Sequence, residues 1–144
     1  MKKIEKIIAT WFGIGLIPVA PGTLGSAGAF PILFLLRKTR PVFKFLFLIF
    51  FIILATAISQ RAKRLFEEDD PKQIVIDEVA GMLVAAIFLP FSFKNILFAF
   101  LIFRLFDITK PPPVKRIEKI KGGIIFDDLI AGLFTFIIMK GIFG

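Results

Sequence analysis

The sequence predicts an all-α protein: a polytopic integral membrane bundle of about four to five membrane-embedded helices with one short interfacial helix. Hydrophobic residues make up 57% of the 144 residues, against about 45–50% in soluble domains. Apolar runs recur along the chain, and charged or proline-rich turns separate them. The length suits one domain, which we expect to cover residues 1–144.

The first part of the chain predicts short elements. Residues 4–12 read as a short amphipathic start that follows the basic N-terminus. The stretch 14–31 is rich in glycine and proline, which favours an irregular or re-entrant segment before a short helix. Residues 27–36 alone are too short to span a membrane, because a straight span needs about 20 residues. Whether the whole stretch 14–36 crosses or re-enters stays open.

The rest of the chain predicts longer apolar segments. Residues 42–59, after a basic turn at 37–41, form the clearest spanning helix. A polar extension and loop follow at 60–73. The three later apolar segments cover residues 74–90, 95–106 and 124–143, with a tight bend at 91–94 between the first two.

Residues 108–123 predict the interfacial helix. The segment is basic, and it has three prolines near one end and two glycines at the other. Its apolar residues recur at i, i+3 and i+6 from Val114, which suits a short helix on the membrane surface. Lys115 and Arg116 would then face lipid headgroups. The prolines stop the preceding apolar helix at the interface.

Charge gives an expected orientation. If each apolar segment moves the chain across the membrane, residues 23–26, 77–78, 107–110 and 127–128 share one side, here called the site face. Lysines and arginines near membrane segments favour the cytoplasm. The site face would carry thirteen of the 19 basic residues and would therefore be cytoplasmic. The basic turn at 37–41 would lie on the opposite face, which argues against this orientation. The other six are Arg37, Lys38, Arg40, Lys44, Lys94 and Lys140.

Five carboxylates on the site face are candidate catalytic groups and metal ligands. Acidic side chains at a membrane edge are costly to bury and are therefore candidate functional residues. With no histidine or cysteine in the chain, oxygen ligands suit Mg²⁺ or Mn²⁺ and not zinc. The alternative is that these acids cap helices, since acids at a helix start complement its dipole. The five are Asp77, Glu78, Asp107, Asp127 and Asp128.

Basic and hydroxyl side chains on the same face are candidate phosphate ligands. Lys110 lies three residues after Asp107 and would offer a point charge to a phosphate, or would only snorkel to water. Arg104 would bind phosphate or pair with Asp107. Thr23 and Ser26, in a glycine-rich turn, would join free backbone N–H groups at a helix start to form an anion site, or would only cap the helix.

Four blocks of the sequence together resemble the signature blocks of the phosphatidylglycerophosphatase A family, in the family's order. They read PGTLGS (21–26), IDEVAG (76–81), FRLFDITKPPPVKR (103–116) and GGIIFDDLIAG (122–132). The resemblance implies a bacterial inner-membrane, Mg²⁺-dependent lipid phosphatase whose active site faces the cytoplasm. It implies removal of the terminal phosphate of phosphatidylglycerophosphate, which gives phosphatidylglycerol.

We expect a catalytic set of Asp77, Glu78, Asp107, Lys110, Asp127 and Asp128, with Thr23, Ser26, Arg104, Lys115 and Arg116 on the substrate. The expected partners are an anionic phospholipid and the membrane, not nucleic acid. Two alternatives stay open: a small membrane transporter or channel component that uses intramembrane acids, or a phosphotransferase on activated lipid headgroups. Gly81 and Gly132 are expected to be helix-packing glycines.

Overall fold

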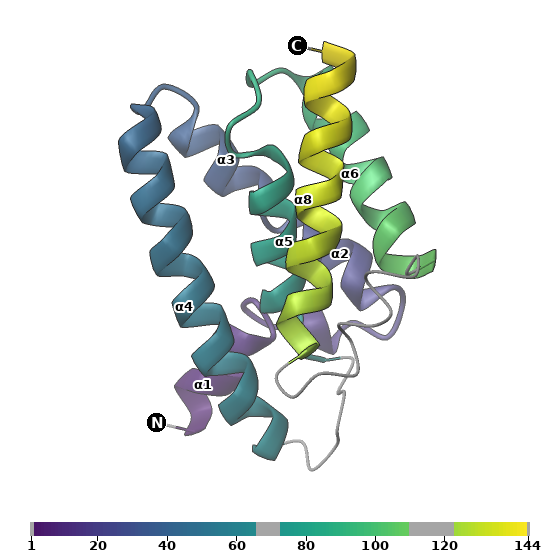
Figure 1. Cartoon of the computed structure of the whole chain (residues 1–144). Helices are drawn as coiled ribbons and strands as arrows, with labels where there is room; N and C mark the ends of the chain where they lie inside the picture. The colour runs from purple at the N-terminus through teal and green to yellow at the C-terminus, as the bar shows by residue number, and fades with distance from the viewer. Residues whose placement is uncertain (1, 66–72, 110–122, 144) are drawn as a thin grey trace.

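A computed structural model describes residues 2–65, 73–109 and 123–143, which form helices joined by short turns, with no strand among them. Figure 1 shows the long helices running alternately up and down, so that chain direction reverses from one to the next. The all-α prediction is therefore confirmed for the described part of the chain. The predicted interfacial helix lies almost entirely outside the described residues.

The N-terminal part folds into four short elements, more regular than expected. They are α1 (Lys2–Ala9), η1 (Ile14–Leu16), α2 (Pro21–Ala27) and α3 (Phe30–Leu36). The sequence predicts an irregular segment where α2 forms. Proline at the first position starts this helix, and its glycines serve close packing: a Cβ on Gly25 would lie 2.6 Å from Cβ of Val75. The glycines of α2 therefore allow close helix packing and do not make this segment irregular.

α4 (Pro41–Leu65) is the long outer helix. It begins at Pro41, the last residue of the predicted turn, and continues six residues beyond the expected end at residue 59, so part of the predicted polar extension is helical. Among the described residues, α4 is the one helix with both the length and the apolar composition to cross a membrane. At about 1.5 Å per residue it exceeds the roughly 30 Å of a bilayer's hydrocarbon core.

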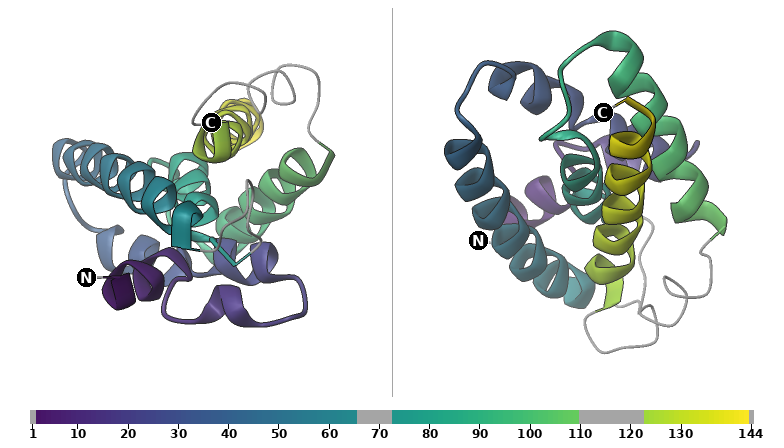
Figure 2. Two further views of the ribbon diagram at one scale, coloured as in Figure 1. Left: turned by 90° about the horizontal axis from the view of Figure 1, so that it is seen from below. Right: turned by 45° about the horizontal axis from the view of Figure 1, so that its top comes forward.

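α5 (Ile76–Ala86) is the central helix, and α6 (Phe93–Thr109) and α8 (Gly123–Phe143) pack beside it. Figure 2 shows α5 surrounded by α4, α6, α8 and the layer of short N-terminal helices. Nine of its eleven residues are buried. The helix occupies only part of the predicted apolar segment 74–90, because it ends at Ala86 and the chain turns through residues 87–89 to Pro90 before α6 begins.

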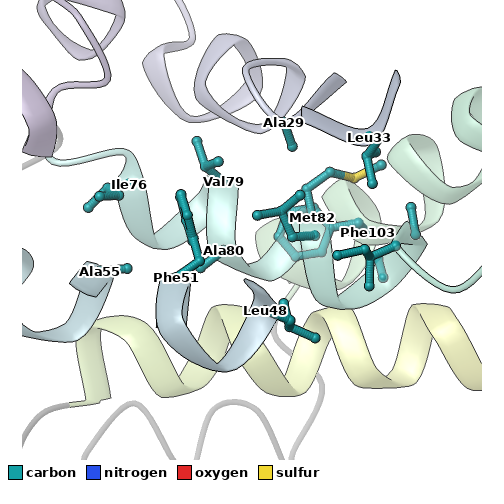
Figure 3. Packing of buried hydrophobic residues seen from close by; sticks show 14 of the residues in the cluster. Ala29, Leu33, Leu48, Phe51, Ala55, Ile76, Val79, Ala80, Met82 and Phe103 are labelled. Carbon is teal, nitrogen blue, oxygen red and sulfur yellow. The ribbon is translucent and has the colours of Figure 1, made fainter. Parts of the chain in front are cut away.

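The hydrophobic core surrounds α5. Figure 3 shows Met82 of α5 close to Phe103 of α6 and Leu33 of α3, while Ala80 of α5 lies near Phe51 of α4. These side chains are almost fully buried. The core includes residues of α5, α6 and α8, the three helices that carry the predicted acids, and it leaves those acids together on one side of the molecule.

Candidate metal centre and active site

The five predicted carboxylates come together at one end of the bundle. Asp77 and Glu78 lie in the first turn of α5, Asp107 lies near the end of α6, and Asp127 and Asp128 lie on α8. They form two trios, in each of which one carboxylate oxygen per residue lies within 4.8 Å of the others. The first trio is Asp77, Glu78 and Asp128, and the second trio is Asp107, Asp127 and Asp128.

The carboxylates of this cluster are largely buried. Asp77 and Asp127 are 6% exposed and Asp128 is 2% exposed. Oδ1 of Asp77, Oε2 of Glu78 and Oδ1 of Asp128 have no hydrogen-bond partner among the described residues. Burying an unpaired carboxylate is costly, and several adjacent carboxylates also repel one another. A hard divalent cation with oxygen ligands fits this donor set, because it would balance the charge and occupy the unpaired oxygens.

The close crossing of α5 and α8 brings the acids of these two helices together. A Cβ on Gly132 would lie 2.2 Å from the carbonyl oxygen of Gly81, and a Cβ on Gly81 would lie 2.7 Å from that of Asp128. Such distances require glycine at both positions. The two glycines are therefore helix-packing residues, as the sequence predicts, and their contact holds the backbone of Asp128 against α5.

The helix-capping alternative differs between the two acid pairs. α8 begins at Gly123, so Asp127 and Asp128 lie beyond its first turn, where a cap or dipole role is weak. The Oδ1 atom of Asp127 instead accepts a hydrogen bond of 3.0 Å from the backbone N–H of Asp128. Asp77 and Glu78 do lie in the first turn of α5, so a dipole contribution applies there.

Arg104 lies beside the second trio. Its guanidinium forms an ion pair with Oδ2 of Asp107, one turn further along α6. Both side chains are mostly buried, and Nε of Arg104 has no hydrogen-bond partner among the described residues. The pairing expected from the i, i+3 spacing is confirmed. Phosphate binding by Arg104 stays a prediction.

The glycine-rich turn reaches the cluster at Glu78. A Cβ on Gly22 would lie 2.8 Å from Oε1 of Glu78, so the start of α2 approaches this carboxylate closely. Ser26 is fully buried, and its hydroxyl donates a hydrogen bond of 2.9 Å to the carbonyl oxygen of Gly22. This bond gives Ser26 a role within α2. Substrate contacts of Ser26 and of the half-buried Thr23 stay predictions.

Three predicted site residues, Lys110, Lys115 and Arg116, lie outside the described residues. Two buried polar groups that the sequence does not single out lie on segments packed against α5. Oγ of Ser59 on α4 and Oε1 of Gln73 have no hydrogen-bond partner among the described residues. The only sequence signal for either is that Ser59 ends an apolar run. Neither residue belongs to a carboxylate trio.

Comparison with known proteins places the chain in a family. The family model described as phosphatidylglycerophosphatase A matches residues 7–143. A Haemophilus influenzae protein named phosphatidylglycerophosphatase A is 34% identical over 141 residues, which cover 94% of this chain and 86% of the relative. An Escherichia coli protein of the same name is 30% identical over 133 residues, covering 90% of this chain and 77% of that relative.

A third relative carries a different name. A Bacteroides thetaiotaomicron protein named as a putative phosphatidylinositol-3-phosphatase is 32% identical over 142 residues, which cover 92% of this chain and 89% of that relative. No solved structure matches the chain. The family model spans all four sequence blocks, including the three from which the clustered carboxylates come. The chain belongs to the phosphatidylglycerophosphatase A family of phosphatases.

Proposed function

We propose that this protein is a Mg²⁺-dependent membrane phosphatase that hydrolyses the terminal phosphate of phosphatidylglycerophosphate to phosphatidylglycerol and phosphate. The single observation that carries the proposal is the buried carboxylate cluster. Its acids come from three separate sequence blocks, and three of their oxygens lack hydrogen-bond partners among the described residues. We treat residues 1–144 as one catalytic domain, which the family match over 7–143 supports.

The proposed metal ligands are drawn from the two trios, Asp77, Glu78, Asp107, Asp127 and Asp128. When bound there, Mg²⁺ supplies charge neutralisation at the phosphate oxygens. Arg104 and Lys110 contribute positive charge to the phosphate, and Thr23, Ser26 and nearby backbone N–H groups complete the cradle. Lys115 and Arg116 hold the anionic headgroup region of the lipid.

The proposed reaction is direct attack of water on phosphorus. The oxygen of water forms a bond to phosphorus, the bond from phosphorus to the glycerol oxygen breaks, and one water proton passes to a carboxylate of the cluster. The departing glycerol oxygen takes up a proton to become the hydroxyl of phosphatidylglycerol. Attack by an aspartate, through an aspartyl-phosphate, is the alternative. We favour water because no single carboxylate is distinguished as a nucleophile.

We further propose that the chain crosses the bacterial inner membrane several times, with the carboxylates near the cytoplasmic surface. α4 has the length and composition of a span. Large apolar side chains are also exposed on other helices, as expected of surfaces that face lipid. They include Phe34 and Leu35 on α3, Leu97, Leu101 and Leu105 on α6, and Leu133 and Ile137 on α8.

A second candidate substrate is an inositol lipid that carries a phosphate monoester. The Bacteroides relative's name favours this possibility. Both substrates present a terminal phosphate on an anionic lipid, so the same carboxylate cluster would serve either. The headgroup alone distinguishes them, and a direct comparison of turnover decides between them.

The decisive experiment measures phosphate release by the purified full chain from phosphatidylglycerophosphate in detergent micelles. We expect release that EDTA abolishes and that added Mg²⁺ restores. A phosphatidylinositol phosphate in equal amount tests the second candidate. Release from neither lipid would contradict the phosphatase proposal and favour a transporter component. Headgroup transfer to an activated lipid without net phosphate release would favour a phosphotransferase. Phosphate release that resists EDTA would contradict the metal dependence but not the phosphatase activity.

A series of isosteric substitutions tests the cluster itself. Asp→Asn at positions 77, 107, 127 and 128, with Glu78→Gln, should each reduce turnover at least about 100-fold, since each removes a charged ligand. Glu5→Gln is the matched control. Glu5 is a mostly buried carboxylate that pairs with Arg61 on α4, and it belongs to neither trio. Near-normal turnover in most of the five variants would show that the site lies elsewhere.

A further inference from the structure

The two trios share Asp128 but differ in how their charge is balanced. The first trio, Asp77, Glu78 and Asp128, forms no ion pair with a lysine or arginine among the described residues. Each of its three carboxylates has one oxygen that lacks a hydrogen-bond partner among those residues. The second trio contains Asp107, which already pairs with the guanidinium of Arg104. Among the residues that the structure describes, a cation is therefore paired with a carboxylate of the second trio and none is paired with a carboxylate of the first.

Burial makes this difference energetically important. Asp77 and Asp128 are almost fully removed from solvent, so solvent screens their charges poorly. A divalent cation bound by the first trio would meet negative charge and unpaired oxygens. A cation bound by the second trio would lie beside the Arg104 guanidinium and would be repelled by it. The two positions should therefore differ strongly in affinity.

We propose that the cluster is an unequal pair of cation positions that share Asp128: the first trio holds the resident divalent cation, and Arg104 stands in for a second cation at the second trio. Arg104 is then a positioning residue that sets the cation affinity of Asp107 and Asp127. The proposal rests on the proposed metal dependence, and it adds the number, location and relative strength of the cation positions.

Arg104 suits this role by chemistry as well as by place. A guanidinium remains protonated at any physiological pH, so its charge at the second trio is permanent. Its Nε is buried and has no hydrogen-bond partner among the described residues, so the pair with Asp107 leaves a donor unused. A lysine at this position would keep the charge, while a glutamine would keep part of the volume and remove the charge.

The test is a Mn²⁺ titration of the detergent-purified full chain without substrate, followed by electron paramagnetic resonance of free Mn²⁺. Mn²⁺ serves as the probe because it prefers the same oxygen ligands as Mg²⁺. We expect one tightly bound Mn²⁺ per chain and a second that binds at least about 10-fold more weakly. Glu5→Gln should reproduce the wild-type titration.

Variants separate the two positions. Glu78→Gln should weaken the tight Mn²⁺ at least about 10-fold, whereas Asp107→Asn should leave it within about threefold. Arg104→Gln should strengthen the weak Mn²⁺ at least about 10-fold, and Arg104→Lys should leave it nearly unchanged because the charge is retained. A purely structural role for Arg104 predicts no gain in affinity from Arg104→Gln. Gel filtration and thermal unfolding establish that each variant is folded.

Several results would overturn the inference. They are two Mn²⁺ ions of equal affinity in the wild type, equal sensitivity of the tight ion to Glu78→Gln and Asp107→Asn, or unchanged or weaker second-site binding in Arg104→Gln. Absence of bound Mn²⁺ in the wild type would also overturn it, even if lipid phosphate were released. Conversely, the expected Mn²⁺ pattern without phosphate release would reject the proposed substrate and leave the cation positions established.

Discussion

α4 and α5 are both apolar helices, but they occupy opposite environments. α4 has 25 residues, and only 28% of its apolar stretch is buried within the protein. α5 has 11 residues, nine of which are buried, and its first turn carries two acids of the cluster. If α4 faces lipid, as proposed above, it can carry charge only near its ends, whereas a central helix can place charge among protein groups or at a metal.

Residue size distinguishes the two helices better than hydropathy does. α5 contains Ala80, Gly81, Ala85 and Ala86, all of them buried, and small residues let neighbouring helices approach closely. α4 instead exposes large apolar side chains in its first half. Small residues therefore mark the central helix that carries site acids, and exposed large residues mark the outer helix. The exposed residues of α4 are Val42, Phe43, Phe45, Leu46, Ile49, Phe50 and Ile53.

The largest expected effect follows from Asp128→Asn, which removes the carboxylate that the two trios share. We expect turnover to fall about 1,000-fold, because the loss of a shared charged ligand removes several kcal/mol of transition-state stabilisation. Phosphate release from micellar lipid measures it. Lys140→Gln, an exposed charge near the other end of α8, is the control. Equal losses in the two variants would contradict a special role for Asp128.

Neighbouring phenylalanines on α4 test the comparison within one helix. Phe51 is 5% exposed and packs edge-on against the ring of Trp11 at 5.8 Å between centroids, whereas Phe50 is 63% exposed. Phe51→Ala should lower the free energy of unfolding by about 3 kcal/mol, because it leaves a cavity. Phe50→Ala should cost less than about 1 kcal/mol. Denaturant unfolding in detergent measures both, and similar losses would mean that α4 has no distinct inner face.

Two glycines of α8 test whether close packing holds the site together. Gly132→Ala should destabilise the fold by about 2 kcal/mol, since the new Cβ would meet the carbonyl oxygen of Gly81. Turnover should fall as well, because Asp128 lies one helical turn away. Gly141→Ala is the matched control: a Cβ there would meet nothing within 4 Å, so stability should stay equal or rise slightly. Unchanged stability and turnover in Gly132→Ala would show that α5 and α8 can accommodate the added methyl group at their crossing.

The smallest expected effect concerns the ion pair that joins α1 to the end of α4. Glu5 accepts a hydrogen bond of 3.2 Å from Nη1 of Arg61, whose side chain is mostly exposed. Glu5→Gln should change the free energy of unfolding by less than about 1 kcal/mol, because solvent screens such pairs. Thermal unfolding in detergent checks this. A loss as large as that of Phe51→Ala would mean that α1 is essential to the fold.

Some of this organisation is readable from sequence because it depends on local composition. A long apolar run flanked by basic residues predicts α4, and the proline before it accounts for its start. Gly81, four residues after Asp77, and Gly132, four residues after Asp128, are predicted to pack helices, and both close contacts are present. Helical order in α2 was not predicted, because glycine and proline are locally ambiguous between a loop and a tightly packed helix start.

The sequence by itself determined the helical class, the outer span and the identity of the five acids, because each depends on residue type and spacing along one segment. Only the tertiary structure decided that the acids divide into two trios sharing Asp128, and that the Arg104–Asp107 pair, which the i, i+3 spacing predicts, belongs to one of them. The reason is physical: the distances between carboxylates on three helices depend on how closely those helices pack. The contact of Gly81 with Gly132 sets that approach for α5 and α8.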